Sequence, residues 1–149
     1  MKSLKFTKIR NVKSPTRGTA KSAGIDFFVP ESFPNTTLGF GQQVIIPSGI
    51  KVKVPEDCAL IAFNKSGIAT KNQLQVGACV VDEDYQGEVH INVYNRGVES
   101  VTITPGMKLT QFILMPVEYC SIVEVEDEGE LYCGVVTQRG DGGFGSTNK

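Results

Sequence analysis

The sequence predicts an all-β fold, a sandwich or barrel of short strands in one domain, and three observations lead to this prediction. Apolar and polar residues alternate in several short runs, as they do in strands with one buried face. Turn residues divide these runs at spacings of about ten residues. The chain has 149 residues, the size of one ordinary domain, and 40% of them are hydrophobic.

The expected strands are short runs rich in β-branched or apolar residues. In chain order they are residues 44–46, 50–54, 80–81, 89–94, 101–103, 106–116 and 122–126. Turns are expected between them at Pro47-Ser48-Gly49, Asn95-Arg96-Gly97 and Pro105-Gly106. Helical periodicity is scarce, and one short helical turn is expected near residues 69–74.

The composition changes only at the C-terminal end. Residues 139–149 read RGDGGFGSTNK, with four glycines and a single apolar side chain, Phe144. Such a segment buries too little apolar surface to order itself. We therefore expect one domain over residues 1–138 and a flexible glycine-rich arm over residues 139–149.

The charge and the cysteines exclude several classes of function. The formal net charge is −1, which gives no broad attraction to nucleic acid or to an anionic membrane. No apolar run reaches the length of a secretion signal or a membrane span. The four cysteines form no C-x-x-C pair, so a zinc site is not expected. These features predict a cytoplasmic protein with reduced thiols, or a nuclear or host-cytoplasmic one if the source is a virus.

The glycine-rich arm carries the first candidate site. Its glycines would let backbone N–H groups wrap round an anion, and Ser146 and Thr147 add hydroxyl donors. Arg139 adds a planar fork suited to a phosphate. Phe144 is out of place in a solvated tail unless its ring covers something flat, such as a base. The competing interpretation is a frayed terminus.

The second candidate is residues 77–87, GACVVDEDYQG. Asp82 directly follows the apolar pair Val80-Val81, and a carboxylate at the end of a strand can orient a water as a general base. Tyr85 offers a flat amphipathic face beside it. The competing interpretation is an ordinary hairpin with its bend at residues 84–87.

Three further segments are weaker signals when taken alone. Lys65-Ser66-Gly67 could cradle a phosphate or be a plain loop. Asp26 enters an apolar stretch, where a turn or cap role is the simpler explanation. Gln111 lies in a strongly apolar strand, where a core hydrogen bond is the simpler explanation.

Taken in order, these five segments resemble the five motifs of the trimeric dUTPase family over residues 23–147. The strongest matches are residues 81–87, VDEDYQG, and residues 139–147, RGDGGFGST. The resemblance implies a distorted jelly-roll-like barrel, the β-clip of that family, and a homotrimer with shared active sites. It also implies Mg²⁺-assisted hydrolysis of dUTP to dUMP and pyrophosphate by water attack at the α-phosphorus. That activity would limit uracil incorporation into DNA and supply dUMP for dTMP synthesis.

The resemblance further implies roles for individual residues. Asp82 would be the catalytic general base, Tyr85 would lie under the deoxyribose, and Asp26 would hold waters of the Mg²⁺ shell. The segment from Val76 to His90 would hold the uracil largely by backbone groups, and Phe144 would stack over it. The implied substrate-binding residues are Lys65, Ser66, Gly67, Val76, Cys79, Val80, Val81, Tyr85, His90, Gln111, Arg139, Phe144, Gly145, Ser146 and Thr147.

The chain departs from the family pattern at a few positions. Lys65 stands where the family usually has arginine, which keeps the charge and loses the bidentate fork. Met107 and Lys108 stand where aspartate and arginine are usual, and Cys79 replaces a small residue beside the base. These changes leave open a non-catalytic protein that senses a nucleotide. A second alternative is a dCTP deaminase, possibly bifunctional, of the same superfamily.

Overall fold

The computed structural model describes residues 2–144, and their fold is mostly strands, which confirms the all-β prediction. The strands are β1 (Lys5–Lys8), β2 (Ile25–Asp26), β3 (Thr36–Leu38), β4 (Gln43–Lys53), β5 (Cys58–Asn64), β6 (Leu74–Val76), β7 (Val80–Val81), β8 (Glu88–Asn95), β9 (Val101–Ile103) and β10 (Thr110–Pro116). The helices are α1 (Ser66–Lys71) and α2 (Glu128–Tyr132). In the described part of the chain, neither helix is long and apolar enough to cross a membrane.

The chain divides into two units, Met1–Glu118 and Tyr119–Lys149. The first unit holds every strand named above, and the second holds α2. The arm expected over residues 139–149 lies within the second unit, which begins twenty residues earlier in the chain.

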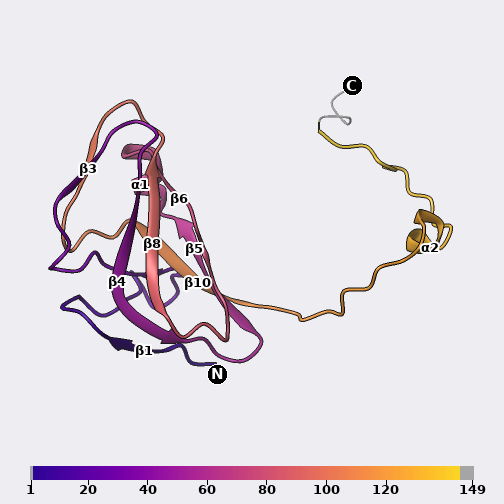
Figure 1. The fold of residues 1–149 in the computed structure, drawn as a ribbon, viewed down its shortest axis with the longest axis horizontal. Coiled ribbons are helices and arrows are strands. Elements are labelled where there is room, and N and C mark those ends of the chain that lie inside the picture. Colours follow the sequence, from indigo (N-terminus) through magenta and orange to yellow (C-terminus); the bar gives the residue numbers. More distant parts are fainter. Residues whose placement is uncertain (1, 145–149) are drawn as a thin grey trace. The chain divides into compact units, whose positions relative to one another are not determined.

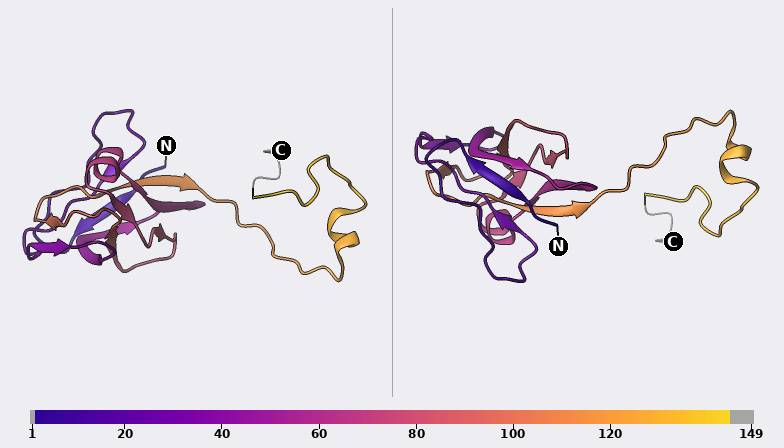
Figure 2. Two further views of the ribbon diagram at one scale, coloured as in Figure 1. Left: turned by 90° about the horizontal axis from the view of Figure 1, so that it is seen from above. Right: turned by 90° about the horizontal axis from the view of Figure 1, so that it is seen from below.

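The strands of the first unit form two four-stranded antiparallel sheets and one short pair. The first sheet has the order β1-β4-β8-β6, the second β2-β10-β5-β7, and β3 pairs with β9. β4 and β8 run side by side along the unit, and β10 crosses them at an angle (Figure 1). β10, in orange in both views of Figure 2, pairs with β5 over its full length.

The core lies between the sheets. Ile46 and Ile91 come from the first sheet, Leu60 and Phe112 from the second, and all four are almost completely buried. The rings of Phe27 and Phe112 pack with their centroids 4.5 Å apart. This packing of two curved antiparallel sheets is the jelly-roll-like arrangement that the family resemblance implied.

The outer face of the second sheet remains apolar. Ile61 pairs in register with both Ile113 and Val80, so these three side chains lie on one face. Val80 is 56% exposed, and Phe63 and Met115 are 39% and 37% exposed. We call these five residues the outer apolar face.

The expected turn at Pro47-Ser48-Gly49 is wrong, because β4 continues through it. The pairing of β4 with β8 shifts between Pro47 and Lys51, so the extra residues form a bulge instead of ending the strand. Gly49 makes the bulge possible with a φ of 74°. The turn residues Pro47, Ser48 and Gly49 therefore indicated a bulge within one strand and not the end of that strand.

Three other expectations also differ from the structure. The helical turn begins at Ser66, earlier than expected, and Leu74 belongs to β6. Residues 122–126 form no strand, since no neighbouring strand pairs with them and Ile122 is 98% exposed. The competing interpretation of an ordinary hairpin with its bend at residues 84–87 is wrong, because β7 pairs with β5 and β8 pairs with β4 and β6.

Candidate active site

A buried carboxylate between two lysines marks one end of the second sheet. Asp26 on β2 is 5% exposed. The Lys65 ammonium contacts its Oδ1, and the Lys108 Nζ lies 3.0 Å from its Oδ2. Burial alone would raise the pKa of Asp26, but the hydrogen bonds and charges of Lys65 and Lys108 outweigh it and lower that pKa. Asp26 is therefore ionised and fixes both ammonium groups.

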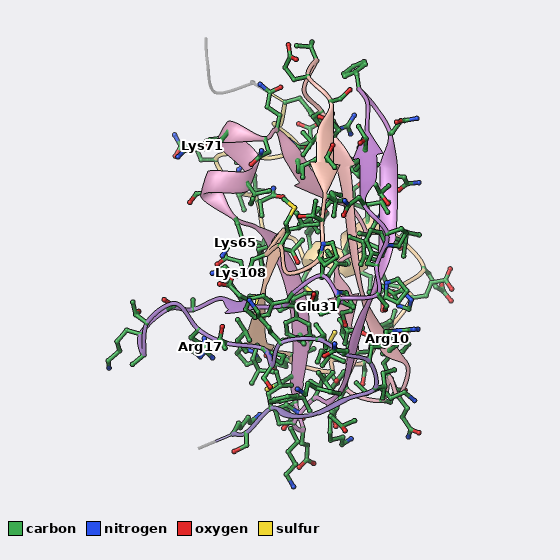
Figure 3. All side chains as sticks on the ribbon, turned by 90° about the vertical axis from the view of Figure 1, so that its left-hand side faces the viewer. Arg10, Arg17, Glu31, Lys65, Lys71 and Lys108 are labelled. Carbon is green, nitrogen blue, oxygen red and sulfur yellow. The ribbon has the colours of Figure 1, made fainter. Side chains whose placement is uncertain are left out.

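The two lysines open onto a pocket of about 510 Å³. It is lined by Lys65, Ser66, Gly67, Ile68, Lys71, Asn72, Met107, Lys108 and Gln111. Lys65 and Lys108 lie next to each other, with Lys71 on α1 above them (Figure 3). Three lysines, one hydroxyl and two amides around a pocket of this size suit a polyphosphate. We call it the cationic pocket.

The fold explains how distant segments reach the cationic pocket. Asp26 and Gln111 are partners in the pairing of β2 with β10, and β5 leads directly into Lys65 and α1. Gln111 is not a buried core amide: it lines the pocket while its Nε2 donates to the Asn64 carbonyl at 2.8 Å. Gly24 is required beside it, since a Cβ there would lie 2.1 Å from the Gln111 Oε1.

The unusual residues at positions 107 and 108 have clear structural consequences. The Met107 side chain packs against the core, and its sulfur accepts from the Thr104 N–H at 3.1 Å. Lys108 pairs with Asp26. The positive charge at position 108, where the resemblance implies an arginine, was the sequence signal that could have identified Lys108 as a site residue.

A second pocket, of about 220 Å³, lies beside β7. It is lined by Ala78, Cys79, Val80, Val81, Tyr85, Glu88, Val89, His90 and Phe112. The structure thus brings together five residues assigned to the nucleoside from the sequence; Val76 belongs to β6 and lies outside this lining. Ala78, Glu88, Val89 and Phe112 are further lining residues that the sequence interpretation did not name individually. We call it the apolar pocket.

Tyr85 is held at the edge of the apolar pocket. Its Oη donates to the Glu88 carbonyl at 2.9 Å, and 43% of the residue is exposed. Its ring lies against Gly87, where a Cβ would be 2.3 Å from the Tyr85 Oη. The His90 Nδ1 also lies 2.9 Å from the Glu88 carbonyl oxygen. Glycine at position 87 therefore lets an aromatic ring lie flat on the backbone.

The Glu88 carboxylate anchors this edge to the rest of the fold. Arg10 donates to it in bidentate fashion at 2.8 and 3.0 Å, and the Gly49 N–H of the β4 bulge donates at 2.7 Å. The Arg10 hydrogen bond lowers the pKa of Glu88; partial burial opposes this, and the Gly49 N–H adds to the lowering. The ion pair thus connects β8, the bulge and the segment after β1.

Glu88→Gln is expected to destabilise the protein at neutral pH and not in acid. Because the pKa of Glu88 is lower in the folded chain, its contribution is complete above the ordinary value of 4.5 and disappears as the pH falls through the folded value. We expect the free energy of unfolding in urea to fall by about 1 kcal/mol at pH 7. The difference should vanish as the pH drops below the folded value. Glu31→Gln, at an exposed loop position, is the control, and a pH-independent difference would contradict the prediction.

Asp82 stands apart from both pockets within one chain. It follows β7, it is exposed, and its carbonyl accepts from the Tyr85 N–H at 3.2 Å. It lines neither the cationic pocket nor the apolar pocket. Val81, one residue before Asp82, and Tyr85, three residues after it, both line the apolar pocket.

The candidate residues of the C-terminal arm belong to the second unit. Arg139 is exposed and its Nε donates to the Gly142 carbonyl at 2.9 Å. Phe144 is fully exposed. The candidates Gly145, Ser146 and Thr147 lie outside the described residues.

This chain is similar to dUTPases in sequence and in fold. The family model described as dUTPase matches residues 10–148. The deoxyuridine 5'-triphosphate nucleotidohydrolase of Mus musculus is 34% identical over 148 residues, which cover 99% of this chain and 86% of that protein. The protein of the same name from Aeromonas salmonicida is 34% identical over 139 residues, covering 91% of this chain and 86% of that protein.

Solved structures show the same fold at lower identity. A mutant dUTPase of Staphylococcus bacteriophage 80alpha, solved with dUpNHpp, superposes with a TM-score of 0.83 at 22% identity and covers 99% of both chains. A mutant dUTPase from phage phi11 of S. aureus, described with a structural Mg(II) ion, has a TM-score of 0.74 at 21% identity and covers 86% of this chain and 99% of that chain.

Proposed function

Because this chain belongs to the dUTPase family, we propose that it hydrolyses dUTP to dUMP and pyrophosphate. The observation that carries the proposal is that the chain has two pockets of different character. The cationic pocket suits a triphosphate, and the apolar pocket suits a pyrimidine held against backbone. Such activity would limit uracil incorporation into DNA and supply dUMP for dTMP synthesis.

The proposed reaction is an in-line attack of water on the α-phosphorus. Asp82 takes a proton from the water, the new bond forms between the water oxygen and phosphorus, and the bond to the bridging oxygen of the β-phosphate breaks. Lys65, Ser66, Gly67 and Gln111 hold the leaving pyrophosphate, so the protein contributes mainly position and charge. Tyr85 supports the deoxyribose and leaves no space for a 2′-hydroxyl.

Mg²⁺ fits this chain as an ion that arrives with the triphosphate. Among residues 2–144, no group of three or more His, Cys, Asp or Glu is placed to hold a metal, and both Asp26 oxygens face lysines. When bound, the ion would neutralise charge on the phosphate oxygens while keeping several of its waters. We propose that Asp26 binds one of those waters. This hydrogen bond would form when Lys65 or Lys108 leaves Asp26 and contacts a phosphate instead.

We further propose that the protein works as a homotrimer with shared sites. The outer apolar face supports this, because Val80, Phe63 and Met115 are exposed on it in a single chain and its other two residues are only partly buried. Residues 1–138 would form the domain and residues 139–149 the flexible arm. In the arm, Arg139, Ser146 and Thr147 bind the terminal phosphates beside Gly145, and Phe144 stacks on the uracil. The expected location is the cytoplasm, or the nucleus or host cytoplasm for a viral protein.

The decisive experiment is a substrate panel with product identification. The protein is incubated with dUTP, UTP, dTTP or dCTP, with Mg²⁺ and with excess EDTA, and pyrophosphate and ammonia are measured. We expect pyrophosphate from dUTP at a much higher kcat/KM than from the other three nucleotides, and only with Mg²⁺. Ammonia from dCTP would indicate a deaminase, and a tight dUTP complex without turnover would indicate a nucleotide sensor.

Lys65→Ala is expected to raise the KM for dUTP by about ten-fold or more, because a charge-assisted hydrogen bond to phosphate is lost. Lys65→Arg restores the charge and adds the fork, so its KM should be no higher than that of the wild type. Both are measured by steady-state pyrophosphate release. Lys21→Ala, at an exposed loop position outside the cationic pocket, is the control. Equal KM values for Lys65→Ala and Lys21→Ala would refute the role of Lys65.

A further inference from the structure

Asn92 is a buried amide on β8 whose hydrogen bonds lead to the apolar pocket. It is 7% exposed. Its Oδ1 accepts from the Ala78 N–H at 2.8 Å. Its Nδ2 donates to the Val44 carbonyl at 2.9 Å and to the Gln43 Oε1 at 3.3 Å. The side chain therefore joins the loop after β6 to β4, on the other side of β8.

Gly77 lies directly on this amide. Its N–H donates to the Asn92 carbonyl at 2.9 Å, so main chain and side chain of Asn92 hold consecutive residues of the loop. A Cβ at Gly77 would lie 1.9 Å from the Asn92 Oδ1 and 2.8 Å from its Cγ. Only glycine at position 77 permits this contact without displacing the amide.

The segment fixed by Asn92 forms one wall of the apolar pocket. Ala78 and Cys79 line that pocket. The Cys79 carbonyl accepts from the Ala62 N–H at 2.8 Å, and the Val76 N–H donates to the Asn64 Oδ1 at 2.8 Å. Residues 76–79 are thus held at every position, and Asn92 supplies the two central hydrogen bonds.

We propose that Asn92 is a positioning residue that sets the base selectivity of the apolar pocket through Gly77 and Ala78. The proposal rests on the proposed function, since it concerns how the uracil of dUTP is recognised. A base read by backbone groups is discriminated only if the backbone is fixed to a fraction of an ångström. Release of the Ala78 N–H from Asn92 would let this wall shift and accept other pyrimidines.

Asn95 offers a matched control on the same strand. It is fully buried, and its amide also makes three hydrogen bonds, to the Leu38 and Glu99 carbonyls and from the Gly97 N–H. None of these partners lines the apolar pocket. Loss of either amide should affect stability, but only the loss of Asn92 should affect base selectivity.

The test compares full-length Asn92→Ala and Asn95→Ala by thermal unfolding and by kcat/KM for dUTP and dCTP. We expect Asn92→Ala to lower kcat/KM for dUTP by about ten-fold, mainly by raising KM. The ratio of kcat/KM for dUTP to kcat/KM for dCTP should therefore decrease. Asn95→Ala should lower the unfolding temperature and leave that ratio unchanged. A folded Asn92→Ala with wild-type selectivity would overturn the proposal.

Gly77→Ala provides an independent test of the proposal. If Asn92→Ala does not fold, the result for Gly77→Ala decides. The added Cβ must displace the Asn92 amide, so the ratio of kcat/KM for dUTP to that for dCTP should decrease as in Asn92→Ala. In the double variant the two effects should not add, because both act through one contact. Unchanged selectivity in Gly77→Ala, or full additivity, would refute the role of Asn92. An inactive wild type would refute the proposed function instead, so the two failures are distinguishable.

Discussion

Asp82→Asn is expected to lower kcat for dUTP hydrolysis by about a thousand-fold, while dUTP still binds. The substitution removes the proton acceptor and keeps the size of the side chain. Asp82 is exposed at the end of β7 and lines neither pocket, so its loss should disturb neither the fold nor the contacts that hold the nucleotide. Pyrophosphate release gives kcat, and calorimetric titration with dUTP gives the affinity.

Asp57→Asn is a suitable control for Asp82→Asn. Asp57 is an exposed carboxylate before β5, and its backbone N–H donates to the Glu83 Oε2 at 2.9 Å in the same region. The Asp57→Asn variant should hydrolyse dUTP with the kcat of the wild type. A rate for Asp82→Asn within a few-fold of the wild type would exclude Asp82 as the base, and a loss of dUTP binding would assign it to recognition.

Removal of residues 139–149 is expected to leave the fold intact and to lower kcat by about a hundred-fold or more. The described core cluster extends only from Val12 to Phe112, so the deleted segment contributes no part of it. The unfolding temperature should therefore match that of the full chain, and turnover should fall because the terminal phosphates lose Arg139, Ser146 and Thr147. Thermal unfolding and pyrophosphate release are measured on the same preparations.

Two outcomes would contradict this view of the arm. If the truncated chain unfolds at a much lower temperature, residues 139–149 are structural; if it keeps full activity, they do not take part in the reaction. A mixture of the truncated chain with Asp82→Asn adds a control for shared sites. Activity should reappear in mixed trimers if the base and the arm of one site come from different copies, and should stay absent if they come from the same chain.

Much of the fold could be predicted from the sequence, because alternation is a local signal. β8 and β9 lie where alternating residues predicted strands, and the apolar run before Pro116 became β10. The errors arose where pairing with a neighbouring strand decides whether a segment forms a strand. Residues 122–126 have strand propensity and no partner strand, and Pro47 to Gly49 read as a turn although β8 continues beside them.

For the candidate site too, residues within one motif could be predicted from the sequence, and contacts between distant segments could not. Residues close in sequence, such as Cys79, Val81 and Tyr85, could be grouped from their motif, and the structure gathers them in the apolar pocket. Asp82, in the same motif, stays outside its lining. The pairing of Asp26 with Lys108 depends on β2 lying beside β10, which no local pattern shows. Asn92 was hidden for a similar reason: within an alternating strand it is one more polar residue, and only the tertiary fold gives it Ala78 as a partner.

If the proposed trimer forms through the outer apolar face, the activity of this chain depends on its concentration. If three copies must meet for each site to be complete, the fraction of competent sites follows mass action, and activity per chain should decrease on dilution. Val80 makes this link direct, because it belongs to that face and also lines the apolar pocket. A polar residue at position 80 would then weaken assembly and nucleotide affinity together, which no substitution confined to one of the two surfaces could do.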